Sequence, residues 1–139
     1  MTRYLLDTNH LSPLVTPGHP VRALVLERAA AGDSFTIPAP VLSEFLYGMA
    51  LLPRRDENQA LWRELADNFG YYHIDRYDAE AAAELRLRLR AAGRQLVLID
   101  ALVAVVALRH GLTLLTTDAD FGAIVGLSRE NWWPHRVQQ

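Results

Sequence analysis

Short apolar segments that alternate with longer helical ones most constrain how this chain can fold. Four segments have the length and apolar content of buried strands: residues 3–6, 34–38, 71–75 and 111–117. Five longer segments have helical composition and are bounded by proline or glycine: residues 21–31, 40–52, 54–69, 78–92 and 98–110. Alternating strands and helices form parallel βαβ units, whose sheet is covered by helices on both faces. We therefore predict a three-layer α/β fold with a central, mostly parallel, twisted sheet.

Some boundaries in this pattern need a decision. Residues 85–90, LRLRLR, alternate with the period of a strand, but the strongly helical DAEAAAE precedes them. We predict one helix here, with Asp78 as its N-cap. Residues 128–134 are predicted to form a final edge strand. Because the 139 residues contain no internal repeat or long linker, we expect a single domain over residues 1–139.

Composition excludes several classes of protein. Hydrophobic residues make up 50% of the chain and charged residues 22%, which is typical of a globular protein. The absence of cysteine excludes disulfides and thiol catalysis, and the absence of lysine excludes P-loop and Schiff-base enzymes. No apolar stretch is long enough to span a bilayer, and the first residues lack the pattern of a secretory signal. We therefore expect no membrane association and a cytoplasmic location.

Acidic residues follow two of the predicted strands. Asp7 comes directly after the first apolar run, and Asp118 follows the strand in LLTTDADF, with Asp120 two residues later. Because the carboxyl ends of parallel strands meet at one edge of a sheet, Asp7 and Asp118 are expected to lie close together. Taken alone, each residue also suits a turn or a helix N-terminus, and that interpretation stays open.

Two further acids lie on predicted helices. Glu44 falls at the edge of an apolar stripe that consists of Val41, Leu42, Phe45, Met49 and Leu52. Asp100 is the only acid on an almost wholly apolar helix, where burying an unpaired carboxylate is costly. The alternatives are an ordinary surface position for Glu44 and an N-cap role for Asp100.

Carboxylates that converge without cysteine, lysine or paired histidine ligands indicate a hard divalent cation. Mg²⁺ and Mn²⁺ prefer oxygen ligands, and such ions assist the hydrolysis of phosphodiesters. The five histidines show no ligand spacing and receive no role: residues 10, 19, 73, 110 and 135. The acids therefore indicate metal-dependent phosphodiester hydrolysis.

Four segments together resemble a known family. YLLDTNHL, VLSEFLYG, LIDALVAVVALRHGLTLLTTDADF and ENW occur in this order across most of the chain. They resemble the PIN-domain ribonucleases, specifically the VapC-type toxins of bacterial toxin–antitoxin pairs. The resemblance implies a PIN-like fold and an acidic quartet that binds Mg²⁺ or Mn²⁺ and catalyses RNA cleavage: Asp7, Glu44, Asp100 and Asp118.

The resemblance also implies supporting residues around this quartet. Thr8 and Asn9 match the polar pair that follows the first acid, and Asn9 is expected to support the metal ligands from behind. Thr117 occupies the hydroxyl position before the fourth acid, where it would hydrogen-bond Asp7 or a metal-bound water. Asp120 is an accessory acid. The chain departs from the family in the apolar residue that precedes the third acid.

The implied activity is endonucleolytic cleavage of structured RNA, such as transfer or ribosomal RNA, held in check by a VapB-type antitoxin. RNA and the antitoxin are thus the expected partners, together with a homodimer or a heteromer with the antitoxin. Tyr47 and Leu51 lie on the Glu44 side of their helix, away from the apolar stripe. They either receive the antitoxin or are buried under the next helix, around Trp62.

Other interpretations stay open for the arginines and for the function. Five arginines either contact RNA phosphates or are ordinary solvated surface residues: Arg54, Arg55, Arg86, Arg90 and Arg94. The alternative function is a catalytically silent PIN-like scaffold for RNA or protein, although an intact set of acids argues against it. An aspartyl phosphatase would need a second aspartate at position 9, which is asparagine here.

Overall fold

A five-stranded parallel sheet forms the centre of the computed structural model, which describes residues 1–134. The strand order is β3-β2-β1-β4-β5, and every neighbouring pair is parallel. The strands are β1 (Arg3–Leu6), β2 (Ser34–Pro38), β3 (Gly70–Tyr72), β4 (Thr113–Leu115) and β5 (Arg129–Glu130). Leu5 at the centre of β1 aligns with Thr36 on one side and Leu114 on the other. The predicted α/β fold with a parallel sheet is confirmed.

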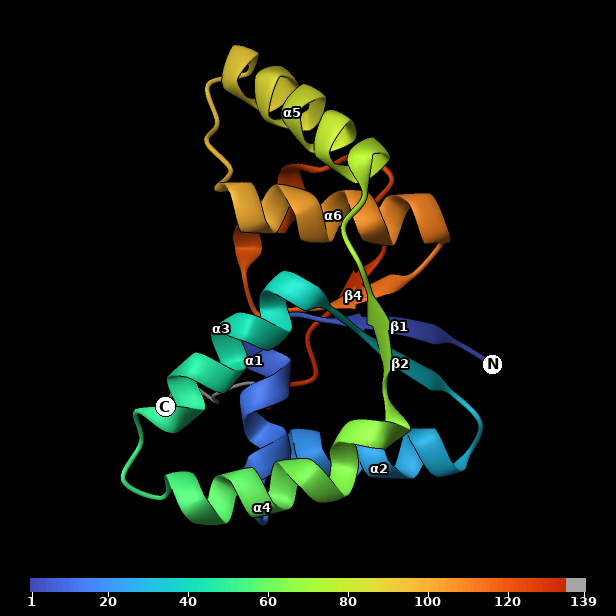
Figure 1. Cartoon of the computed structure of the whole chain (residues 1–139). Helices are drawn as coiled ribbons and strands as arrows, with labels where there is room; N and C mark the ends of the chain where they lie inside the picture. The colour runs from blue at the N-terminus through green and yellow to red at the C-terminus, as the bar shows by residue number, and fades with distance from the viewer. Residues whose placement is uncertain (135–139) are drawn as a thin grey trace, which may run out of the picture.

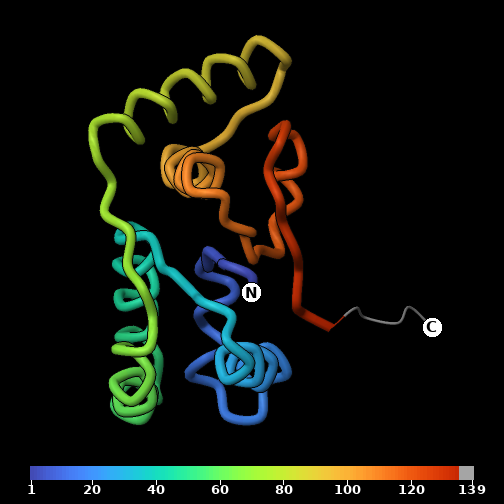
Figure 2. The backbone as a smooth tube through the Cα atoms, turned by 90° about the vertical axis from the view of Figure 1, so that its right-hand side faces the viewer, coloured from blue at the N-terminus to red at the C-terminus, as the bar shows by residue number. Residues whose placement is uncertain are grey.

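Helices cover both faces of this sheet, as Figures 1 and 2 show. The helices α5 (Arg76–Ala91) and α6 (Leu98–His110) lie on one side. The other side carries α1 (Thr8–Leu11), α2 (Pro20–Ala30), α3 (Ala39–Ala50) and α4 (Arg55–Leu65). Three 3₁₀ turns complete the described chain: Ser12–Val15, Ala66–Asn68 and Ala119–Ala123.

The order of layers explains the apolar sequence of α6. This helix packs between the sheet and α5, which runs across its outer face (Figure 1). Residues 103–107 are accordingly all buried, and the helix needs no polar face. Gly111 then ends α6 in a left-handed conformation (φ 63°), which turns the chain back into β4.

Several predicted boundaries differ from the structure. The helix expected from Asp78 begins at Arg76, and Asp75 is its N-cap, because Asp75 and Asp78 exchange hydrogen bonds in a capping box. Leu52, expected in the core stripe, is half exposed because α3 ends at Ala50. LRLRLR is helical as predicted, within α5.

The end of the described chain packs against the core. Trp132 contacts the rings of Tyr4 and Phe35, with centroid distances of 4.9 and 5.9 Å. The edge strand β5 pairs with β4, although it is only two residues long. Within residues 1–134, no helix combines the length and apolar character that crossing a membrane requires. His135 lies outside the described residues.

Candidate active site

Two acids lie at the carboxyl ends of neighbouring strands. Asp7 follows β1 directly, and its Oδ1 accepts a hydrogen bond from the Thr8 backbone N–H at 2.8 Å. Asp118 follows β4 after two threonines, and its Oδ1 accepts a hydrogen bond from the Asp120 N–H at 2.9 Å. Both residues therefore cap short helices, as the turn interpretation expected. Because β1 and β4 pair in parallel, the same capping geometry holds both carboxylates at one edge of the sheet.

The second oxygen of Asp7 is held by side chains. Its Oδ2 accepts hydrogen bonds from the Thr116 hydroxyl at 2.8 Å and from Asn9 Nδ2 at 3.3 Å. The Thr116 hydroxyl oxygen in turn accepts the Asp118 backbone N–H at 3.0 Å. One buried hydroxyl thus connects the two strand-end acids, and Asn9 donates to the same oxygen of Asp7.

The hydroxyl expected from Thr117 belongs to its neighbour. Thr116 continues the line of β4, since its N–H still donates to the Glu130 carbonyl at 3.0 Å. Successive side chains on an extended strand point to opposite sides, so Thr116 faces Asp7 while Thr117 is exposed. Thr117 contributes its backbone instead, donating its N–H to Asn9 Oδ1 at 3.1 Å. The expected hydrogen bond of the Thr117 hydroxyl to Asp7 is therefore wrong, and the alternative, a hydrogen bond to a metal-bound water, stays a prediction.

His10 is a supporting residue that the sequence did not reveal. Its ring is fully buried, which together with the nearby charge of His19 lowers its pKa from 6.5 to about 4. Nε2 accepts the Trp132 backbone N–H at 3.0 Å, so the ring proton sits on Nδ1 and is donated to Asn9 Oδ1 at 2.7 Å. The Trp132 segment therefore reaches Asp7 through His10 and Asn9. Only the sequence separation of 122 residues hid this connection.

Asp100 is the third residue of α6, and the N-cap is Val97. The N-cap interpretation of Asp100 is therefore wrong. Burial, followed by the negative charges of nearby acids, raises the pKa of its carboxyl from 3.8 to about 6. Those acids, from the largest effect to the smallest, are Asp7, Asp118, Glu44 and Asp120. The other three members of the predicted quartet and the accessory acid therefore all lie close enough to Asp100 to raise its pKa.

Glu44 approaches this neighbourhood from α3. It is exposed, and the Thr8 hydroxyl donates a hydrogen bond to its Oε1 at 3.5 Å. Thr8 and Glu44 both line a cavity of about 310 Å³, which also contacts Gly48. Helix α1 packs against α3, and this packing brings Thr8 and Glu44 together.

The five acids lack a cationic partner within the described residues. The ion pairs among residues 1–134 involve none of them. Carboxylates crowded in this way destabilise one another unless a cation joins them. Their oxygen-only donor set fits a hard divalent ion. As they stand, no three acidic or histidine side chains within residues 1–134 are arranged around one common point.

The sequence matches the PIN domain family over residues 4–127. This chain belongs to the PIN-domain family. The plasmid stability protein StbB of Pseudomonas syringae pv. tomato is 30% identical to this PIN domain over 135 residues, which cover 93% of the chain and 97% of StbB. Ribonuclease VapC4 of Mycobacterium tuberculosis is 31% identical over 96 residues, 68% of this chain and 74% of VapC4. The resemblance to VapC-type proteins is confirmed.

Solved structures show the same fold. VapBC2 from Rickettsia felis, bound to a DNA fragment from its promoter, superimposes with a TM-score of 0.81 and 25% identity. The match covers 94% of this PIN domain and 99% of that chain. VapC20 of Mycobacterium tuberculosis, a sarcin–ricin loop cleaving toxin, has a TM-score of 0.65 over 89% of this chain and 95% of its own. At 19% identity, VapC20 shows the common fold alone.

Proposed function

We propose that this VapC-type PIN domain is the toxin of a toxin–antitoxin pair and cleaves RNA with the help of a divalent metal ion. The observation that carries the proposal is the set of five carboxylates, Asp100 and the four acids around it, which form no ion pair with a cation within residues 1–134. The ribonuclease name of VapC4, a relative of 31% identity, supports RNA as the substrate. Mg²⁺ and Mn²⁺ are the ions that such a donor set favours.

Four carboxylates would hold the metal: Asp7, Glu44, Asp100 and Asp118. When bound, a divalent ion supplies an activated water and stabilises the oxygen that leaves phosphorus. The chain itself orients the ligands. Thr116 and Asn9 fix one oxygen of Asp7, and the Asp118 N–H is fixed by the same Thr116 hydroxyl. Asp120 and Thr117 are proposed to support the metal ligands, Asp120 through its charge and Thr117 through its contact with Asn9.

A VapB-type antitoxin is the proposed partner. Solved relatives include VapBC complexes from Rickettsia felis and Salmonella typhimurium. Tyr47 and Leu51 are 71% and 68% exposed, so the interpretation that the next helix buries them around Trp62 is wrong. These side chains leave an apolar surface beside Glu44, where an antitoxin segment would cover both the surface and the acids. Replacing Tyr47 with alanine should weaken inhibition by the antitoxin and spare cleavage, whereas Tyr77→Ala, at 69% exposure on α5, should change neither.

Cleavage of total cellular RNA by the purified, antitoxin-free protein tests the proposed activity. Reactions contain Mg²⁺, Mn²⁺ or EDTA, and the new RNA ends are mapped. The wild type should give discrete, metal-dependent cuts in structured RNA such as transfer or ribosomal RNA. Asp7→Asn should abolish them, because the neutral amide retains the shape of the side chain and loses the charge. The control Asp56→Asn changes a side chain that is 91% exposed and should cut like the wild type.

Two results would contradict the proposal. Cuts of equal rate in EDTA would remove the metal from the mechanism. A folded wild type that binds RNA without cutting it in either metal would instead support the alternative, a catalytically silent PIN-like scaffold.

A further inference from the structure

A cavity lined by arginines lies between α5 and the loop that leads to α6. Its volume is about 700 Å³, and Arg86, Arg90 and Arg94 line it. No acidic residue lines it, and none of the three arginines takes part in an ion pair within residues 1–134. Other arginines of the described chain, such as Arg76 and Arg109, do pair with acids. The cavity therefore gathers three positive charges that no acid within residues 1–134 pairs with.

The fold of α5 places these arginines on one side. The side chains of Leu85 and Leu89 are buried towards the core. Arg86 and Arg90 are one helical turn apart on a different, exposed face. Residues on that face line the cavity, whereas the buried leucines face the molecule's interior.

The end of α5 fixes the third arginine. Gly93 has a left-handed conformation (φ 78°), the Gly93 N–H donates to the Arg90 carbonyl at 2.9 Å, and the Arg94 N–H donates to the Leu89 carbonyl at 2.8 Å. This pair of bonds is a Schellman motif, which reverses the chain within two residues. Arg94 is thereby returned to the side of the helix that carries Arg90.

The opposite wall of the cavity is tied to α5. Arg86 Nε donates a hydrogen bond to the Leu96 carbonyl at 3.0 Å, and the Leu96 side chain is buried. This contact holds the loop between α5 and α6 in place. It uses only one nitrogen of the guanidinium group and leaves the other donors of Arg86 for a ligand.

The cavity leads towards the acidic site. Arg94 also lines a smaller neighbouring cavity of about 150 Å³, and Asp120 lines that same cavity. On the other side, Val97 lines the arginine cavity and caps α6, whose first turn carries Asp100. Arginine donors therefore continue from α5 to the edge of the site where the acids gather.

We propose that this cavity binds the phosphodiester backbone of the RNA next to the bond that is cut, with Arg90 and Arg94 as phosphate ligands and Arg86 as the anchor of the cavity wall. The inference rests on the proposed ribonuclease function and adds the surface that positions its substrate. Guanidinium groups match phosphate oxygens with two parallel hydrogen bonds, and their charge attracts the polyanion. The acids repel RNA without a metal, so a flanking positive surface is needed to hold the strand.

RNA binding measured as a function of salt tests this proposal. The probe is a short labelled RNA that spans a cut site mapped with the wild type, and all proteins carry Asp7→Asn so that the probe stays intact. In this background, the double variant Arg90→Gln, Arg94→Gln should weaken binding by about 10- to 100-fold at low salt. Losing two phosphate contacts should also make the slope of log K against log salt shallower by about 1.4.

A matched control lies on the same helix. Arg88 is exposed on α5, has no ion pair within residues 1–134 and lines neither cavity. Arg88→Gln removes one positive charge, half of what the double variant loses, and should leave both the Kd and the salt slope nearly unchanged. Equal effects of the control and the double variant would overturn the proposal, because general charge would then account for binding.

The outcomes separate this proposal from the function on which it rests. If the wild type cuts RNA while the double variant binds like the control, the cavity has another occupant, such as an acidic protein segment, and only this inference fails. If the wild type neither binds nor cuts RNA, the ribonuclease function itself fails. Unfolding temperatures of the variants identify any loss that arises from misfolding.

Discussion

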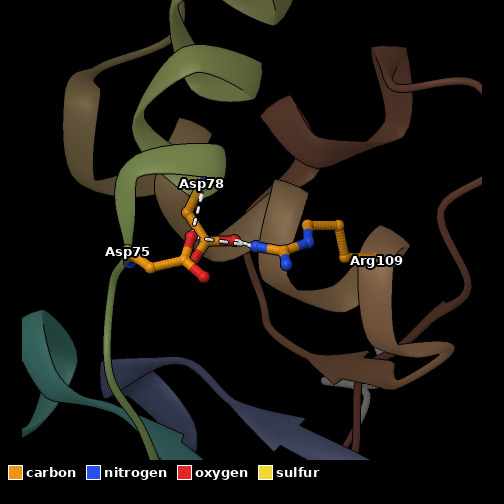
Figure 3. A network of polar contacts seen from close by, with 3 residues as sticks. All are labelled: Asp75, Asp78 and Arg109. Carbon is orange, nitrogen blue, oxygen red and sulfur yellow. Dashed lines mark hydrogen bonds and ion pairs between the residues drawn. The ribbon is translucent and has the colours of Figure 1, made fainter.

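Two groups of acids in this molecule meet opposite environments. In the first group, Asp75 and Asp78 at the start of α5 both contact the guanidinium of Arg109 on α6, at 3.0 and 2.6 Å (Figure 3). Asp78 is only 2% exposed, yet the backbone N–H of Asp75 and the arginine satisfy it. In the second group, Asp100 and the acids around it include hydrogen-bonded carboxylates but form no ion pair in the part of the chain that the structure describes.

One acid in each group has a shifted pKa, and the two shifts have opposite directions. In the first group, the hydrogen bond from the Asp78 backbone N–H, followed by the contacts with Arg109, lowers the pKa of Asp75. In the second group, burial and the surrounding negative charges raise the pKa of Asp100 to about 6. Acids that the fold itself neutralises stabilise the contact between two helices. Acids that the fold leaves crowded and unpaired are suited to bind a cation from solution.

The largest expected effect comes from neutralising the buried acid of the first group, Asp78. Asp78→Asn should lower the free energy of unfolding by about 3 kcal/mol, because the buried carboxylate loses its charged hydrogen bond to the partly exposed Arg109 and the capping box loses a charged acceptor. Urea unfolding at neutral pH measures the loss. RNA cleavage per folded molecule should be unchanged. A loss similar to that of a surface substitution would mean that the Arg109 contact contributes little.

Metal addition should affect only the second group. Mg²⁺ or Mn²⁺ at one hundred times its Kd should raise the free energy of unfolding by about 2.7 kcal/mol, since the ion binds the folded chain alone. Thermal unfolding with and without EDTA measures this gain. Asp100→Asn should lose the gain and Asp78→Asn should keep it. An equal gain in Asp100→Asn would place the ion elsewhere.

The pH dependence of unfolding gives a smaller effect of known sign. Because the pKa of Asp100 is raised from 3.8 to about 6 by folding, the folded chain binds this proton more tightly than the unfolded chain. The stability that protonated Asp100 provides is present below pH 4 and is lost as the pH rises towards 6. Solvent screens part of the interaction at this half-buried group, so we expect a loss on the order of 1 kcal/mol.

Asp100→Asn removes this titration. In metal-free buffer, the stability of the variant relative to the wild type should increase as the pH rises from 4 to 6 and then level off. A constant difference across this range would show that neither burial nor the neighbouring acids raise the pKa of Asp100 in the folded protein. Taking the difference between the two proteins cancels the contribution of His10, whose lowered pKa acts in the same pH range with the opposite sign.

Local sequence patterns predicted the parallel sheet and the acids at its edge. Apolar runs that end in acids placed Asp7 and Asp118 correctly, because the ends of neighbouring parallel strands are fixed by topology. The helical composition of the preceding DAEAAAE also predicted correctly that LRLRLR is helical. Patterns of this kind depend only on residues that are close in the sequence.

The parts that sequence reasoning missed depend on contacts between distant residues. Whether Thr116 or Thr117 faces Asp7 depends on where β4 stops pairing with β5, a register that the threonine pair does not encode. The role of His10 depends on Trp132, 122 residues later. The N-cap of α5 is Asp75 and not the predicted Asp78. Either aspartate suits an N-cap in the sequence, and Arg109, which contacts both, lies on another helix.

The smallest predicted effect separates burial from pairing. Arg76 and Glu80 form an ion pair at 2.8 Å on the same helix α5, but their side chains are 87% and 57% exposed. Water already solvates both charges, so Arg76→Ala should change the free energy of unfolding by less than about 0.5 kcal/mol. Urea unfolding beside Asp78→Asn makes the comparison direct. If the exposed Arg76–Glu80 pair were as stabilising as the Arg109–Asp78 pair, the distance between the charges alone would account for the stabilisation. The burial of Asp78 would then contribute nothing to it. A near-zero effect would show that an ion pair stabilises this fold only where the acid is buried. Asp7 is buried and Asp100 is partly buried, and neither has a cationic partner in the described chain.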